Sequence, residues 1–227
     1  MNKIVVDKES KIELSNNIID LEINNNELEL VINGKVLINE ISFKNEENLK
    51  LVIRMNKNST LIYNRFISHN IMNNDVKIIQ EDNSDITFNY SIVANDKCNL
   101  NVDCDLLGNK NNSVIKVRAV AKEKGKCNIK STASVKPLIN NNELLESIKV
   151  ITLNDEEHVI IPNLLVSSNE VVVNHAATIS SIDPSYLFYL NSKGIDNKDA
   201  KELITKGFLL SNMDNLEGIK DKIDEII

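Results

Sequence analysis

The stretch Pro162–Phe208 reads PNLLVSSNEVVVNHAATISSIDPSYLFYLNSKGIDNKDAKELITKGF, and it decides the fold because strand-like sequence ends there and helical sequence begins. Residues 171–179 alternate with the period of a β-strand. The odd-numbered side chains share one, mainly apolar, face: Val171, Val173, His175, Ala177 and Ile179. A strand with one buried face is therefore expected up to about residue 180.

Two short helices are predicted after this strand. Asp183 is a suitable N-cap, and Pro184 follows at a position where a missing N–H is tolerated. Gly194 is expected to end the first helix, because glycine readily adopts the positive φ of a helix terminus. The second helix is predicted from the cap Asp196 to a stop at Gly207. Its buried stripe is expected to consist of Ala200, Leu203 and Ile204.

Upstream, period-two alternation dominates from about residue 21 to residue 178, and strand centres follow each other every ~11–15 residues. Such spacing is typical of sandwiches, barrels and β-solenoids. Only one Asn-Gly pair, Asn33-Gly34, offers a tight hairpin turn. Asn-rich corners at 24–26, 109–112 and 140–142 suit a solenoid, because asparagine tolerates left-handed backbone geometry. The pattern therefore favours a β-solenoid over a sandwich.

The last segment, 214–227, is predicted to be a third helix. Its apolar residues recur at near-helical spacing: Leu216, Ile219, Ile223 and Ile226. Two roles for the C-terminal helices follow from the pattern. They cap the end of a strand stack, or they form a docking surface for a partner.

Charge and composition limit the classes of function. The chain has 227 residues and a formal net charge of −7, with no cluster of Lys and Arg, so nucleic acid is not expected as a partner. No apolar run has the length of a membrane span, and the N-terminus does not resemble a signal peptide. Three cysteines without a CxxC pair favour reduced thiols, and hence a cytoplasmic location.

The cysteines and histidines are the residues whose side chains could act as soft or nitrogen metal ligands. Cys98, Cys104 and Cys127 lie on apolar strand faces and are predicted to be small buried side chains rather than zinc ligands. His69 and His158 are predicted to lie at the surface. His175 differs, because an imidazole on an apolar face needs a hydrogen-bond partner or a metal ion.

The stretch 162–208 resembles the C-terminal part of the SufB/SufD family, which acts in the SUF system of iron–sulfur cluster assembly. The match consists of short elements in a fixed order. They are Pro162 and Leu164, His175 with Ala177-Thr178, Ile182-Asp183, Leu187-Phe188-Tyr189-Leu190, Ser192-Lys193-Gly194-Ile195, Ala200 and Gly207-Phe208. A weaker similarity extends upstream to about Lys116. The first hundred residues resemble the family only in the general character of their sequence.

This resemblance implies a mainly β fold, a right-handed parallel β-helix over residues 1–180 followed by a small helical domain over 181–227. It implies a non-enzymatic, short SufD-like scaffold subunit that docks the ABC-type ATPase SufC and pairs with a second SufB/SufD-like subunit. Whether that partner is a copy of this chain or a different subunit stays open. The residues expected at the ATPase contact are Tyr186, Leu187, Phe188, Leu190, Ala200, Leu203, Ile204 and Phe208.

Of the family's candidate ligands, His175 alone carries over. The glutamates that flank this histidine in SufB-like members are Asn174 and Ala176 here, and the cysteine that SufD-like members often have two residues before it is Val173. The resemblance thus implies at most one ligand, His175, to a transient iron–sulfur cluster at a subunit interface. No cluster is expected on the isolated chain.

Two alternatives remain at this stage. The first is a structural dimer of the family that has lost cluster chemistry. The second is a β-helix enzyme acting on polysaccharide, for which Asp103 and Asp105 would be the carboxylate pair. A chain with 4% aromatic residues and no Trp offers few surfaces for stacking on sugars, so the enzyme is the less favoured alternative.

Overall fold

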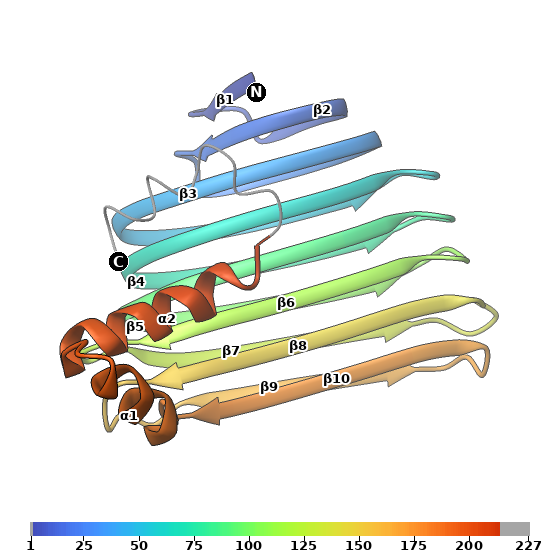
Figure 1. Ribbon diagram of the computed structural model, residues 1–227. Coiled ribbons are helices and arrows are strands. Elements are labelled where there is room, and N and C mark those ends of the chain that lie inside the picture. Colours follow the sequence, from blue (N-terminus) through green and yellow to red (C-terminus); the bar gives the residue numbers. More distant parts are fainter. Residues whose placement is uncertain (1, 214–227) are drawn as a thin grey trace.

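The computed structural model describes residues 2–213 as a stack of parallel strands followed by two helices (Figure 1). The strands are β1 Asn2–Val6, β2 Lys11–Ile23, β3 Glu27–Met55, β4 Thr60–Gln80, β5 Asp85–Leu106, β6 Asn112–Ala121, β7 Lys126–Val135, β8 Asn142–Thr152, β9 Val159–Val166 and β10 Val171–Ser180. The helices are α1 Pro184–Ser192 and α2 Asn197–Leu210. The predicted third helix lies outside the described residues.

The strands wind into a parallel β-helix, which confirms the solenoid prediction and rules out a sandwich of antiparallel sheets. The long strands β3, β4 and β5 bend and contribute to both walls of the solenoid (Figure 1). After β5 the walls separate, β6–β8–β10 on one side and β7–β9 on the other, and every pairing is parallel. The strands begin at Asn2, well before the predicted start near residue 21.

Asparagine ladders connect successive coils. Asn64 donates to Asn39 and Asn89 donates to Asn64, both at 2.9 Å between residues 25 apart, so 25 residues complete one turn there. Each amide thereby satisfies its neighbour in a buried position, as in other stacked parallel strands. Asparagine also supplies left-handed corner residues, including Asn58 and Asn83 with φ of 61° and 56°.

Rows of in-register side chains fill the interior of the β-helix. One row runs from the second strand to the last and consists of Ile19, Ile38, Tyr63, Phe88, Ile115, Glu146 and His175. Aromatic rings meet edge to face within it, with the centroids of Tyr63 and Phe88 5.5 Å apart. The first five members are buried and mainly apolar, and they belong to one continuous core.

The predicted start signals of both helices are confirmed. The Asp183 carboxylate accepts from the Ser185 N–H at 2.8 Å, with Pro184 in the first turn, and Asp196 accepts from the Asp199 N–H at 2.8 Å. Gly194 follows α1 with φ of 85°. The chain leaves β10 at Ser180 and enters α1 at Pro184, close to the proposed domain boundary.

The predicted stop at Gly207 is wrong, because α2 continues to Leu210. Tertiary packing outweighs the low helix propensity of glycine here. Leu209 and Met213 pack against apolar side chains of the sheet, namely Phe66, Val93 and Val120. The Ser91 hydroxyl also donates to the Leu209 carbonyl at 2.9 Å. The end of α2 is thereby fixed to the β-helix.

The predicted buried stripe of α2 is correct in part. Ala200 is fully buried, but Leu203 is 52% exposed, and Thr205 and Leu209 are buried instead. The stripe is shifted because the last turn of α2, rather than its middle, contacts the sheet. Within residues 2–213, neither helix is long and apolar enough to cross a membrane.

Candidate functional site

His175 lies on the last coil of the β-helix, on the face that points toward the interior. It pairs in register with Glu146 on β8, and in the described chain β10 has no strand partner on its other edge. His175 is therefore exposed, although the corresponding positions of earlier coils are buried. In-register residues on parallel strands lie about 4.8 Å apart with their side chains on the same side. The structure thus places His175 and Glu146 as neighbours on adjacent strands, with no hydrogen bond between their side chains in the described residues.

Glu146 is a buried carboxyl in an otherwise apolar wall. The Ser131 hydroxyl on β7 contacts its Oε1, whereas its Oε2 is buried and has no hydrogen-bond partner among the described residues. Burial raises the pKa of the Glu146 carboxyl above its ordinary value, against the opposing effects of Ser131 and His175. Sequence analysis missed this residue, although it shares an alternating face of β8 with Leu144, Ile148 and Val150.

The two strands of the last coil differ as edges. On β9, Pro162 has no N–H to donate, which makes that edge a poor template for another strand. The ten-residue strand β10 contains no proline. Apolar side chains are exposed on both strands: Val159, Ile161, Leu165, Val166, Val172 and Ile179. The last coil is therefore an open apolar end with one edge suited to strand pairing.

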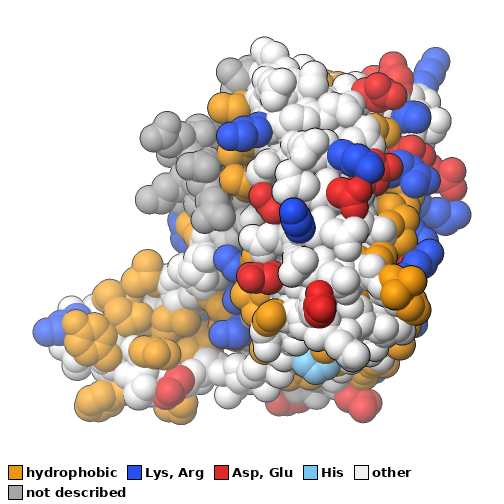
Figure 2. Space-filling model, turned by 90° about the vertical axis from the view of Figure 1, so that its right-hand side faces the viewer, with side chains coloured by type: hydrophobic (Ala, Val, Ile, Leu, Met, Phe, Trp, Pro, Cys, Tyr) orange, Lys and Arg blue, Asp and Glu red, His pale blue; other side chains and the backbone are white. Residues whose placement is uncertain are grey.

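The helical segment carries a second exposed apolar surface. Phe188 is 76% exposed and Tyr186 is 62% exposed, and Leu203 adds to them from α2. Among the other predicted contact residues, Leu187, Leu190, Ile204 and Phe208 are half-buried, and Ala200 is buried. Figure 2 shows apolar side chains gathered on the helical segment that projects from the β-helix. Patches of this kind mark interaction sites in soluble proteins.

The three cysteines are buried, as predicted: Cys98, Cys104 and Cys127. Cys98 and Cys127 pair in register between β5 and β7. The hydrogen bond that the Cys98 thiol donates to Cys127, together with burial, raises the pKa of Cys98, and burial likewise raises the pKa of Cys104. Residues 2–213 contain no group of three or more His, Cys, Asp or Glu side chains placed to hold a metal ion.

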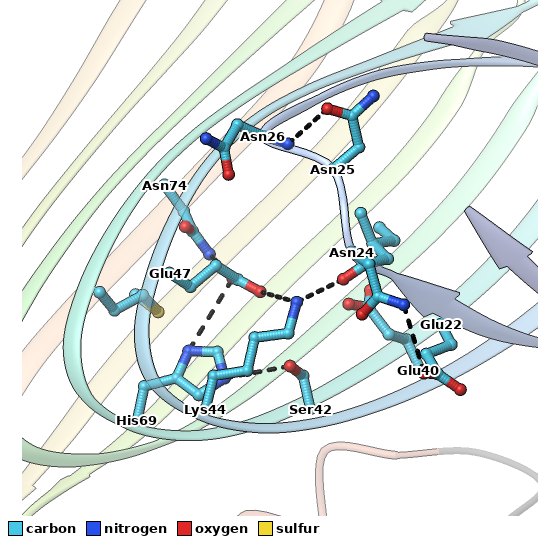
Figure 3. A network of polar contacts seen from close by, with 12 residues as sticks. Glu22, Asn24, Asn25, Asn26, Glu40, Ser42, Lys44, Glu47, His69 and Asn74 are labelled. Carbon is cyan, nitrogen blue, oxygen red and sulfur yellow. Dashed lines mark hydrogen bonds and ion pairs between the residues drawn. The ribbon is translucent and has the colours of Figure 1, made fainter. Parts of the chain in front are cut away.

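The prediction that His69 lies at the surface is wrong. His69 is buried within β4, and its Nε2 lies 3.0 Å from the Ser42 hydroxyl (Figure 3). The side-chain amide of the neighbouring Asn70 donates to Asn45 on the adjacent coil. Burial lowers the pKa of His69 to about 4, although the Glu47 carboxylate, 4.0 Å from Nδ1, acts in the opposite direction.

The prediction for His158 is also wrong in part, because this residue is half-buried. Its Nδ1 accepts from the Cys127 N–H at 3.2 Å, and its Nε2 lies 3.0 Å from the Thr152 hydroxyl. Both ring nitrogens thus hold the loop before β9 against the body of the β-helix. These two hydrogen bonds give His158 a structural role.

A buried ionic network, which sequence analysis missed, surrounds Arg65. Its Nε lies 2.7 Å from Glu40 and its Nη2 lies 2.8 Å from Glu47, and all three side chains are buried. Asn74 donates to Glu47 at 2.6 Å, and Lys44 approaches the same carboxylate from the open side at 3.9 Å (Figure 3). The buried guanidinium is thus paired with two carboxylates, one of which also has Lys44 nearby.

Two observations bear on the alternative of a polysaccharide-cleaving enzyme. A hollow of about 740 Å³ lies over the N-terminal strands, and its lining contains asparagines, Lys35, Thr60 and apolar residues but no Asp, Glu or His. Asp105 is held by Lys77 at 3.2 Å and by the Ser134 hydroxyl at 2.6 Å. Glycoside hydrolysis needs two carboxyl groups facing one cleft. The described residues do not provide such a pair around this hollow.

These features define a class of protein: a parallel β-helix with an open terminal coil and an apolar helical segment beside it. Residues 2–208 match the family described as "SUF system FeS cluster assembly, SufBD core domain". The chain belongs to this family, which confirms the resemblance noted from the sequence.

Individual relatives agree with this assignment. The iron–sulfur cluster assembly protein SufD of Bacillus subtilis is 37% identical over 68 residues, which cover 29% of this chain and 16% of the relative. SufD of Escherichia coli is 34% identical over 64 residues, covering 27% and 15%. A SufBD family protein of Methanocaldococcus jannaschii is 24% identical over 194 residues, covering 70% and 60%. The chain thus matches less than two thirds of each relative's length.

Proposed function

We propose that this chain is a non-enzymatic scaffold subunit of an iron–sulfur cluster assembly complex. The observation that carries the proposal is the match of residues 2–208 to the SufBD core domain, together with two separate exposed apolar surfaces, one on the last coil of the β-helix and one on the helical segment. A scaffold needs surfaces for partners rather than a catalytic cleft. SUF assembly is the function for which the matching relatives are named.

The first surface is the helical segment, which we assign to an ABC-type ATPase. Exposed aromatic side chains such as Tyr186 and Phe188 are typical anchors of protein interfaces. The last turn of α2 is fixed to the sheet by Leu209, so force applied to the helices would reach the β-helix. The ATPase would supply the energy of ATP hydrolysis, and this chain would supply the rigid body that it moves.

The second surface is the last coil, which we assign to pairing with another SufB/SufD-like subunit. Strand addition at the β10 edge would satisfy its backbone groups and cover the exposed apolar side chains, including Val172 and Ile179. His175 would then lie at the interface. Because this chain offers no complete ligand group in its described part, any cluster there would need ligands from the partner.

Co-expression with the SUF-type ABC ATPase of the same organism tests the helical surface. The wild-type chain should co-elute with the ATPase on gel filtration at micromolar concentration, and Phe188→Asp should abolish co-elution. Leu138→Asp is the matched control, because Leu138 is 91% exposed on a distant corner. Equal co-elution of Phe188→Asp and wild type would remove the helices as the docking site.

A further inference from the structure

Glu146 interrupts an apolar row, and Ser131 binds only one of its two carboxyl oxygens. Its row is otherwise hydrophobic up to Ile115, and its interior neighbours along β8 are Leu144 and Ile148. Burying a carboxyl among apolar side chains is unfavourable, and replacing a buried charged group by an apolar one of similar size is often neutral or stabilising. A further role for this carboxyl would explain its presence.

The adjacent position of the same row is His175, where the interior opens to the surface. The positions beside it on β10 are Val173 and Ala177, which continue the apolar rows of Leu144 and Ile148. Glu146 and His175 are therefore in-register neighbours on the same side of β8 and β10, and they form the only polar step among these three rows at the end of the described β-helix. Since Ser131 occupies Oε1, the buried Oε2 of Glu146 is the atom left for His175.

We propose that Glu146 is the positioning residue for His175. Its Oε2 accepts the N–H of one imidazole nitrogen, fixes a single tautomer and leaves the other nitrogen free as an electron-pair donor at the open end. Histidines that bind metals commonly donate their second N–H to a carboxylate in this way. The chemistry suits a divalent iron ion, and this extension rests on the proposed function.

Nitrogen-15 NMR of the full-length chain, labelled at its three histidines, tests the assignment. His175→Gln identifies the His175 signals. At pH 7.5 the wild type should show one protonated and one unprotonated nitrogen in His175. Glu146→Met should give averaged signals from two exchanging tautomers, while its melting temperature stays equal to or above that of the wild type. Ser131→Ala is the matched control and should keep the single tautomer.

An unchanged single tautomer in Glu146→Met would overturn the proposal, as would exchanging tautomers in the wild type. A purely structural role for Glu146 would show the reverse pattern, a lower melting temperature with His175 unaffected. Co-elution of Glu146→Met with the ATPase is measured in parallel. If Glu146→Met co-elutes with the ATPase and the tautomer of His175 is unaffected, the role of Glu146 is refuted and the proposed function stands. If the wild type does not co-elute with the ATPase, the proposed function is refuted.

Discussion

Arg65 and Glu40 form a fully buried ion pair inside the β-helix, with 2.7 Å between Nε and Oε2. Arg65 lies in register with Glu40 on one side and with Tyr90 on the other. Glu47 provides the second carboxylate, and the Tyr63 hydroxyl donates to Glu40 at 2.5 Å. The guanidinium thus links three coils of the solenoid.

Arg65→Met should destabilise the chain by about 3–5 kcal/mol, because the substitution leaves two buried carboxylates without their cation. Urea unfolding of both proteins measures the difference. Arg54→Met is the control, since Arg54 pairs with Glu29 at the surface, and it should cost less than about 1 kcal/mol. A similar small loss for both variants would mean that the buried network does not hold the coils together.

His69 should make stability depend on pH. The folded chain keeps His69 neutral down to about pH 4, whereas the unfolded chain takes up the proton near the ordinary pKa of 6.5. The unfolded state therefore binds more protons between these values, and stability falls as the pH decreases. From pH 7 to pH 5 the loss due to His69 is about 2 kcal/mol.

His69→Gln isolates this contribution from other groups. Glu47 also makes the folded chain less stable as the pH falls, because its pKa is lowered in the folded state. Burial alone would raise this pKa, but Arg65 and His69 outweigh it. Denaturant unfolding at both pH values should therefore show a smaller loss on acidification in His69→Gln than in wild type. Equal losses in the two proteins would contradict the buried, neutral state of His69.

The buried asparagine ladder should matter more than an exposed one. Asn64→Ala removes the hydrogen-bond partner of two buried side-chain amides, those of Asn39 and Asn89. The substitution should lower the free energy of unfolding by about 2–4 kcal/mol. Asn70→Ala removes one exposed bond to Asn45 and should cost less than about 1 kcal/mol. Thermal unfolding of the two variants compares them directly, and the reverse order would contradict the ladder's role.

Leu209→Ala should release the end of α2 from the sheet, with a loss of about 2–5 kcal/mol for a buried leucine. Hydrogen exchange in α2 should accelerate strongly. Leu203→Ala is the control on the same helix, because Leu203 is exposed, and it should leave exchange unchanged. Unaltered protection of α2 in Leu209→Ala would show that other contacts fix this helix.

The fold was predictable where the signal is local. Alternation identified the strands, and Asp183, Asp196 and Gly194 identified most helix ends, because these depend on neighbouring residues. The error at Gly207 arose from contacts that α2 makes with distant strands. The solenoid was predicted from the asparagine-rich corners and from the family resemblance, because the sequence contains no clear repeat.

The candidate site was predictable in part for the same reason. His175 was recognised from its place in an alternating strand, but Glu146 precedes it by a full coil of 29 residues, and the register between them cannot be read from either strand alone. Arg65 and Glu40 were missed because their pairing depends on a coil of 25 residues. His69 was misplaced because its burial depends on contacts with an adjacent coil, such as that with Ser42, rather than on neighbouring residues.

Native mass spectrometry of the complex purified with the ABC-type ATPase tests the central claim most directly. The account predicts particles that contain the ATPase and two β-helix subunits, either two copies of this 25.6 kDa chain or one copy with a second SufB/SufD-like subunit. The same spectrum therefore distinguishes a homodimer from a heterodimer. A spectrum that shows this chain alone at its monomer mass, with the ATPase present but unbound, would contradict the account.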